Sequence, residues 1–138
     1  MIVKRSLGPS LMSHNPLSNF TIVVVEDHDD TRKFLGNFLG HLGANVRLAR
    51  NASEGVEAVK TSRPNLVLCD IKMPGRDGFD VLSEIRGLGP FAGDSVPVIA
   101  MSALVSHASA RMIGFQACLA KPFTPDKLVE TILTALND

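Results

Sequence analysis

Short apolar runs alternate with amphipathic stretches along most of this 138-residue chain. Five of the apolar runs have the length and composition of β-strands: residues 20–25, 44–49, 65–70, 96–101 and 117–120. The first, third and fourth are almost continuously apolar, which is typical of strands buried on both faces. The second mixes apolar and polar residues, which favours a position at the edge of a sheet.

Amphipathic helices are predicted after each of these runs. The stretch 29–43 starts with Asp29 or Asp30 as N-cap, and Gly43 ends it. Its apolar stripe consists of Phe34, Leu35, Phe38, Leu39 and Leu42. The next helix, over residues 53–62, is expected to be capped by Ser53.

The remaining three helices are predicted over residues 78–88, 106–115 and 124–137. The first of them turns Val81, Leu82 and Ile85 inward. The last has the clearest signal, because Thr124 is a good N-cap and Pro125 suits the first helical position. Its buried stripe is Leu128, Val129, Ile132, Leu133 and Leu136.

Strict alternation of strand and helix predicts an α/β fold with a parallel sheet covered by helices on both faces. The length suits one domain. Residues 1–19 mix Ser, Pro, Asn and Gly without any period, so we interpret them as a flexible N-terminal tail or linker, with the folded domain over 20–138.

Charge and composition exclude several classes of function. The chain has 14 acidic and 14 basic residues, so no overall field attracts nucleic acid or anionic lipid. No apolar stretch is long enough to span a bilayer, and the first 19 residues do not resemble a signal peptide. A cytoplasmic protein is expected. Cys69 and Cys118 lie in or beside apolar runs and have no metal or redox spacing.

Side chains that can carry chemistry stand at the ends of the expected strands. In sheets of this kind the ligand site lies beyond the carboxyl ends of the strands. The residues placed there are Glu26, Asp27, Asp70, Ser102 and Lys121. Clustered carboxylates repel one another unless a cation lies among them, and oxygen ligands without His or Cys favour Mg²⁺ or Mn²⁺. The hydroxyl and the ammonium suit the oxygens of a phosphoryl group.

Glu26, Asp27 and Lys121 also have structural interpretations that involve no bound ligand. Glu26 and Asp27 could instead cap the following helix, but a cap needs one acid and four acids stand between residues 26 and 30. Lys121 could be a solvated surface residue, although the following Pro122 favours a fixed position. Gly75 and Gly78 would let the loop after Asp70 turn sharply.

With these motifs in order, the chain resembles the receiver domains of response regulators in two-component signalling. The resemblance covers residues 20–138. It is carried by the acidic pair Glu26-Asp27, by the segment DIKMPGRDGF that begins at Asp70, by Ser102 in IAMSA and by Lys121 in AKPF. It implies a flavodoxin-like, doubly wound sheet in the order 2-1-3-4-5, the order that regulators of this family illustrate.

The resemblance also implies roles. Asp70 would accept a phosphoryl group from a phosphohistidine, with Ser102 and Lys121 beside it. Mg²⁺ would be held by Asp27, Asp70 and the backbone carbonyl of Lys72, with Glu26 acting mainly through water. The implied partners are a sensor histidine kinase or a histidine phosphotransfer protein, and a downstream protein, without nucleic acid or direct membrane contact. The protein would be a switch and not an enzyme, either a single-domain regulator or the receiver of a hybrid kinase.

The chain departs from the family three residues before the lysine, where an aromatic residue or His is usual and Cys118 stands here. A cysteine is too small to swing across a groove, so we expect output to rely on Ser102 and the loop from Leu104 to His107. A redox role or a disulfide to Cys69 is not expected. Lys72 and Leu104 occupy the positions that tune phosphoryl lifetime in the family, and we expect Leu104 to shield the phosphoryl group from water.

Two other functions compete with the switch. A phosphatase of the haloacid dehalogenase kind also uses an aspartate after a strand, but it has a second acid two residues later, where this chain has Lys72. A binding module that takes no phosphate is the other alternative. The complete set of acceptor residues disfavours it.

Overall fold

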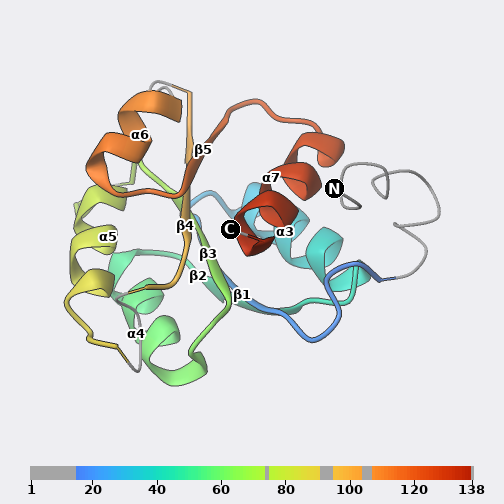
Figure 1. Cartoon of the computed structure of the whole chain (residues 1–138), viewed down its shortest axis with the longest axis horizontal. Helices are drawn as coiled ribbons and strands as arrows, with labels where there is room; N and C mark the ends of the chain where they lie inside the picture. The colour runs from blue at the N-terminus through green and yellow to red at the C-terminus, as the bar shows by residue number, and fades with distance from the viewer. Residues whose placement is uncertain (1–14, 74, 91–94, 104–106, 138) are drawn as a thin grey trace.

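Five parallel strands form one sheet in the order β2-β1-β3-β4-β5, in the described part of the chain (Figure 1). The computed structural model describes residues 15–73, 75–90, 95–103 and 107–137. The strands are β1 (Thr21–Val25), β2 (Asn45–Ala49), β3 (Leu66–Asp70), β4 (Val98–Ser102) and β5 (Ala117–Ala120). The predicted fold class and strand order are confirmed.

The helices cover both faces of this sheet (Figure 1). One face packs against α3 (Asp29–His41) and α7 (Pro125–Asn137), the other against α4 (Ala52–Ser62), α5 (Gly78–Arg86) and α6 (His107–Ile113). On the second face α4 approaches β1 so closely that a Cβ at Gly55 would lie 2.7 Å from a Val25 methyl group. Among the described helices, none has the length and apolar character that crossing a membrane requires.

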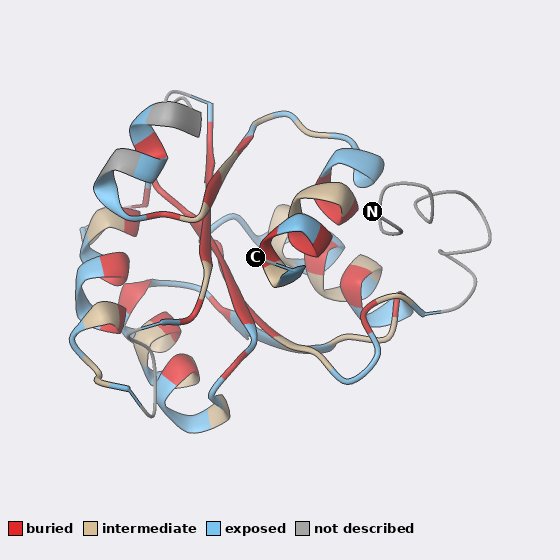
Figure 2. Cartoon of the chain, in the orientation of Figure 1, coloured by how far each residue is buried: buried red, intermediate tan, exposed pale blue. Residues whose placement is uncertain are grey.

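Burial follows the predicted strand types. In Figure 2 the central strands are red between the two layers of helices, and every residue of β3 and β4 is buried. At the sheet edge most of β2 is accessible, with Leu48 45% exposed, and only Ala49 is buried. An edge strand has only one covered flank, so its half-polar sequence matches its place.

The N-caps of two helices differ from the prediction. His28, and neither Asp29 nor Asp30, caps α3, because its backbone is extended and its Nδ1 accepts a hydrogen bond from the Thr31 amide. Asn51, and not Ser53, caps α4, with its side chain accepting from the Glu54 amide at 2.9 Å. In both cases the helix begins at the residue after the last extended one.

The helix ends predicted at Gly43 and at Thr124-Pro125 agree with the structure, whereas α5 and α6 each end two residues earlier than predicted. Gly43 follows α3 with a φ of 101°, a left-handed conformation that favours glycine. Thr124 caps α7 by accepting from the Lys127 amide at 3.1 Å, and Pro125 is the first helical residue. Asp77 caps α5 in a capping box with Asp80.

The folded region starts earlier than the sequence indicated. Leu17 is fully buried in the core beneath α3 and α7, and its amide donates to the Leu42 carbonyl at 2.9 Å. The boundary at Phe20 is therefore corrected to include residues 15–19, because a turn packs Leu17 against the end of α3. Residues 1–14 of the expected tail lie outside the described residues.

The two cysteines do not pair, as expected. Cys69 on β3 stands opposite Ala100 on β4, which stands opposite Cys118 on β5. Neither Cys69 nor Cys118 forms a disulfide. One strand therefore separates them, beyond the reach of a disulfide.

Candidate functional site

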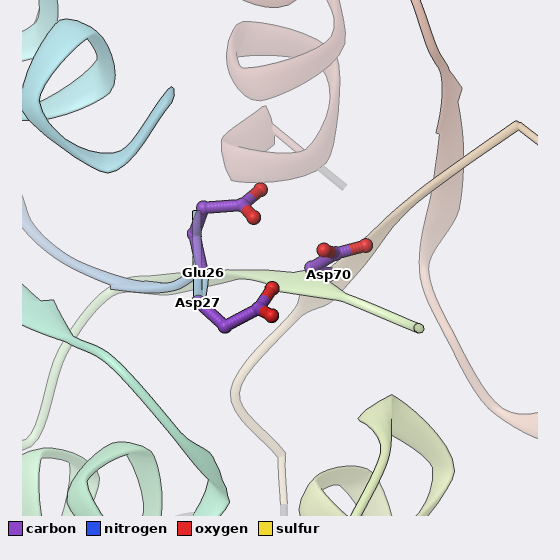
Figure 3. Close-up of side chains that lie close together, drawn as sticks. All are labelled: Glu26, Asp27 and Asp70. Carbon is purple, nitrogen blue, oxygen red and sulfur yellow. The ribbon is translucent and has the colours of Figure 1, made fainter. Parts of the chain in front are cut away.

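Three carboxylates meet at the carboxyl end of the sheet. Glu26 and Asp27 directly follow β1, and Asp70 is the last residue of the neighbouring β3. One oxygen from each carboxylate lies within 4.8 Å of the others. Figure 3 shows the three side chains turned toward a common space from the two strand ends. The strand order therefore brings together residues that are far apart in the sequence.

An ammonium group closes one side of this cluster. Lys121, directly after β5, places its Nζ 3.0 Å from Glu26 Oε1 and 3.4 Å from Asp70 Oδ2. Its side chain is 28% exposed, whereas those of Glu26 and Asp70 are 1% and 9% exposed. The Lys121-Pro122 peptide bond is cis. The lysine is held by two buried carboxylates, which excludes the interpretation as a solvated surface residue.

The predicted hydroxyl residue lies at the same edge. Ser102 is the last residue of β4 and is 6% exposed. It stands opposite Ala120 in the sheet, and its carbonyl accepts from the Lys121 amide at 3.0 Å. Ser102 and Lys121 are therefore fixed to each other through the backbone of adjacent strands.

Burial raises the pKa of Asp70, the acid at the end of β3. Removal from water raises the pKa of Asp70 to about 6, the negative charge of Glu26 adds to the effect, and Lys121 opposes it. Burial lowers the pKa of Lys121, but its hydrogen bond to Glu26 and the charges of Glu26 and Asp70 more than offset this, so the pKa is raised. The ammonium is therefore firmly charged, and a second cation would favour ionised Asp70.

Glu26 does not act as a helix cap. Its carboxylate is fully buried and accepts from the His28 amide at 3.1 Å, while Oε1 accepts from Lys121. The sequence reasoning did not identify Arg32, whose guanidinium donates to the backbone carbonyls of Glu26 and Asp27 at 3.0 and 3.3 Å. A basic residue one turn into the helix after an acidic pair was the available signal.

The loop after Asp70 returns tightly onto the strand. The Gly78 amide donates to the Ile71 carbonyl at 2.8 Å, and a Cβ at Gly78 would lie 2.8 Å from the Asp70 carbonyl oxygen. Gly75 has a φ of 80°, as the sharp turn requires. Glycine at position 78 therefore lets α5 start directly against the backbone of Asp70.

The donor set fits a divalent cation of the hard type. Two of the three carboxylates are buried, and the cluster holds three acids against one ammonium, which leaves negative charge in a poorly solvated place. Mg²⁺ prefers one or two carboxylates and keeps several waters. The cluster of Glu26, Asp27 and Asp70 therefore fits Mg²⁺, while the ligand role of each residue, including that of the Lys72 carbonyl, stays a prediction.

Cys118 lies on β5, three residues before Lys121, and is half-buried. Burial raises the pKa of its thiol, which disfavours the reactive thiolate. A hollow of about 280 Å³ borders it, with charged residues of α6 and α7 on its walls: Arg111, Lys127 and Glu130. Residues 104–106, which include the predicted shield Leu104, lie outside the described residues.

Comparison with known proteins assigns this arrangement to one family. The family model described as "Response regulator receiver domain" matches residues 22–133. An uncharacterized 14.6 kDa protein from the sodA1 3' region of Leptolyngbya boryana is 34% identical over 119 residues, which cover 84% of this chain and 89% of that protein. The sensor histidine kinase RcsC of Salmonella typhi is 32% identical over 114 residues, covering 80% of this chain and 12% of the kinase.

The fold is shared with solved structures of the same kind. The receiver domain of the sensor histidine kinase PA1611 from Pseudomonas aeruginosa, which has a magnesium ion in its active-site cleft, matches with a TM-score of 0.77 and 26% identity. That match covers 88% of this chain and all of the other. The chain thus spans the length of some relatives and a small part of multidomain kinases.

Proposed function

The chain belongs to the response regulator receiver domain family, and we propose that it is a signalling switch that accepts a phosphoryl group on Asp70. The phosphorylated and unphosphorylated forms would differ in their affinity for a protein partner. One observation carries this proposal: Lys121 Nζ lies between Glu26 and Asp70, with the carboxylates of Glu26, Asp27 and Asp70 converging.

The residues of the site divide the work of phosphoryl transfer. An Asp70 oxygen attacks the phosphorus atom, forming an O–P bond, while the bond from phosphorus to the imidazole nitrogen of a donor histidine breaks. The Lys121 ammonium binds one phosphoryl oxygen, and the Ser102 hydroxyl donates to another. The buried strand β3 keeps the nucleophile in place, which serves a reaction that depends on positioning and charge neutralisation.

Asp27 and Asp70 would hold Mg²⁺, which, when bound, neutralises charge on the phosphoryl oxygens and on Asp70. Glu26 would act through water, because it is committed to Lys121 and to the His28 amide. Lys72, two residues after the acceptor, has an exposed side chain and is free to approach phosphoryl oxygens.

The surface beside the site suits a protein donor. A hollow of about 560 Å³ extends from Lys121 to Phe34 of α3, which is 45% exposed and stacks on Phe38. Pro122 and Phe123 line the same hollow. An apolar patch next to the acceptor supports docking of a sensor histidine kinase or a histidine phosphotransfer protein there. RcsC, a sensor histidine kinase, contains a segment related to this chain.

The first experiment is intact-protein mass spectrometry after incubation with acetyl phosphate. Wild type and Asp70→Asn are compared, each with Mg²⁺ and with EDTA. A gain of one phosphoryl mass that requires both Asp70 and Mg²⁺ is the expected result. Ser102→Ala and Lys121→Gln should slow the gain, because each removes a group that binds the phosphoryl oxygens.

Other results would favour the alternatives. If neither acetyl phosphate nor a purified phosphorylated histidine phosphotransfer protein adds mass to the wild type, the chain is a binding module. If the wild type instead turns over a phosphate monoester continuously, it acts as a phosphatase. The sequence disfavours turnover, because Lys72 stands where such phosphatases have a proton-donating acid.

A further inference from the structure

The contacts of Arg32 extend the site beyond its carboxylates. Arg32 lies in the first turn of α3, and its side chain is 11% exposed. Its NH1 donates to the carbonyls of Glu26 and Asp27, at 3.0 and 3.3 Å, and its NH2 pairs with Asp29 Oδ1 at 2.5 Å. One guanidinium thus contacts Glu26, Asp27 and Asp29, three residues of the segment that begins with two of the acids.

This segment has little other support from the sheet. The Glu26 amide still donates to the Ala49 carbonyl of β2 at 3.0 Å, but the chain then leaves the ladder. Two residues further along, the His28 amide donates to Glu26 Oε2 at 3.1 Å. The direction of the Glu26 carboxylate therefore depends on the orientation of the peptide groups between residues 26 and 28.

We propose that Arg32 is a positioning residue for the metal site: its guanidinium fixes the peptide groups of Glu26 and Asp27 and thereby aims their carboxylates. The inference rests on the proposed function, because it assumes that these acids hold a divalent cation. The planar fork of arginine is needed, since a lysine ammonium is a point charge and does not span both carbonyls and Asp29. Groups that orient metal ligands typically change metal affinity 10-fold to 100-fold.

Whether loss of Arg32 weakens or strengthens Mg²⁺ binding distinguishes a positioning role from a simple charge effect. Removing a cation beside a metal site should strengthen Mg²⁺ binding if only Coulomb repulsion mattered. Loss of positioning should weaken it. Arg50 offers a matched control, because it is an arginine that pairs with an acid on the surface, Glu54 at 2.8 Å, without touching the acidic cluster.

The experiment titrates EDTA-treated protein with Mg²⁺, followed by amide NMR shifts, and with Mn²⁺, followed by electron paramagnetic resonance. Arg32→Ala should raise both dissociation constants about tenfold. Arg50→Ala should leave them within about twofold, because Arg50 is an exposed charge that makes no contact with the cluster. Arg32→Lys keeps the charge and the aliphatic stem and should weaken metal binding by an intermediate factor. It serves as the test variant if Arg32→Ala does not fold.

A second readout needs no metal. Hydrogen exchange of the His28 amide should be faster in Arg32→Ala than in wild type and unchanged in Arg50→Ala, because the first change releases the segment that aims Glu26. Unchanged or tighter metal binding in both Arg32 variants would overturn the positioning role of Arg32 and leave the proposed function standing. A wild type that binds neither ion would overturn the proposed function as well.

Discussion

The two ends of the sheet differ in what they bury. At the carboxyl end, three polar residues are almost inaccessible: Glu26, Asp70 and Ser102. At the amino end, Leu17 and Leu66 are fully buried, and the Asn65 side chain and backbone close the edge with bonds to Thr21. The carboxyl ends of the strands therefore hold the polar residues of the candidate site, and the amino ends are packed with apolar residues.

The difference has an energetic meaning. Burying apolar side chains stabilises the fold, whereas burying carboxylates costs free energy unless cations and hydrogen bonds compensate. Lys121 compensates only in part, as the raised pKa of Asp70 shows. We infer that the amino end stabilises a site that is itself destabilising when no divalent cation is bound.

The largest effect is expected at the amino end. Leu17→Ala should lower the free energy of unfolding by about 3 kcal/mol, because it leaves a cavity in the core. Urea denaturation followed by circular dichroism measures it. Leu48→Ala is the matched control on exposed β2 and should cost under about 1 kcal/mol. Equal losses for the two leucines would contradict the packing of residues 15–19.

A smaller effect is expected where the site meets the backbone. Gly78→Ala should cost about 2 kcal/mol and slow phosphorylation by acetyl phosphate, because the new Cβ would lie 2.7 Å from the Ile71 Cα. Gly40→Ala is the control, since nothing lies within 4 Å of a Cβ there. In helix α3 that change should be neutral or stabilise by under about 1 kcal/mol. Identical stability and phosphorylation rates would refute the close packing at Asp70.

The next effect depends on pH. The pKa of Asp70 is raised from 3.8 to about 6, so between these values the folded state binds more protons than the unfolded state. This group therefore makes the free energy of unfolding fall as pH rises through that window. In EDTA, Asp70→Asn should be more stable than wild type at pH 7.5, on the order of 1 kcal/mol, and no more stable at pH 4.

The smallest effect has the opposite sign and concerns an exposed acid outside the cluster, Glu54. Hydrogen bonds and charge from Arg50 lower the pKa of Glu54 to about 2. Its stabilising contribution is present above pH 4.5 and is lost as pH falls toward 2. Glu54→Gln should thus slightly destabilise the protein at pH 7.5. If both carboxylate variants shifted stability in the same direction with pH, the contrast between buried and exposed acids would be wrong.

Much of the carboxyl end could be predicted from the sequence. Asp70 and Lys121 each follow a short apolar run, and the rule that ligands bind beyond parallel strands places them together. The edge position of β2 followed from its mixed composition. These signals are periodic or positional, so a single sequence carries them.

The missed features depend on single contacts. Leu17 is one apolar residue among Asn, Pro and Ser, so no period marks it as core. His28 and Asn51 cap their helices because their backbones are extended, while neighbouring residues are equally able to cap. Arg32 contacts backbone carbonyls, which every residue has, so its place one turn into the helix after the acidic pair was a weak signal.

The distance along the chain between Lys121 and its partners sets an order of assembly. Lys121 lies 95 positions after Glu26, and β1 and β3 are synthesised before β5. Until β5 joins the sheet, Glu26 and Asp70 meet without this ammonium, and like charges disfavour their burial. A nascent chain that ends before Lys121 should therefore stay open at neutral pH and close when β5 and α7 emerge. The Lys121 ammonium, which prepares the site for phosphate, would thus also be required late in folding, when Glu26 and Asp70 become buried.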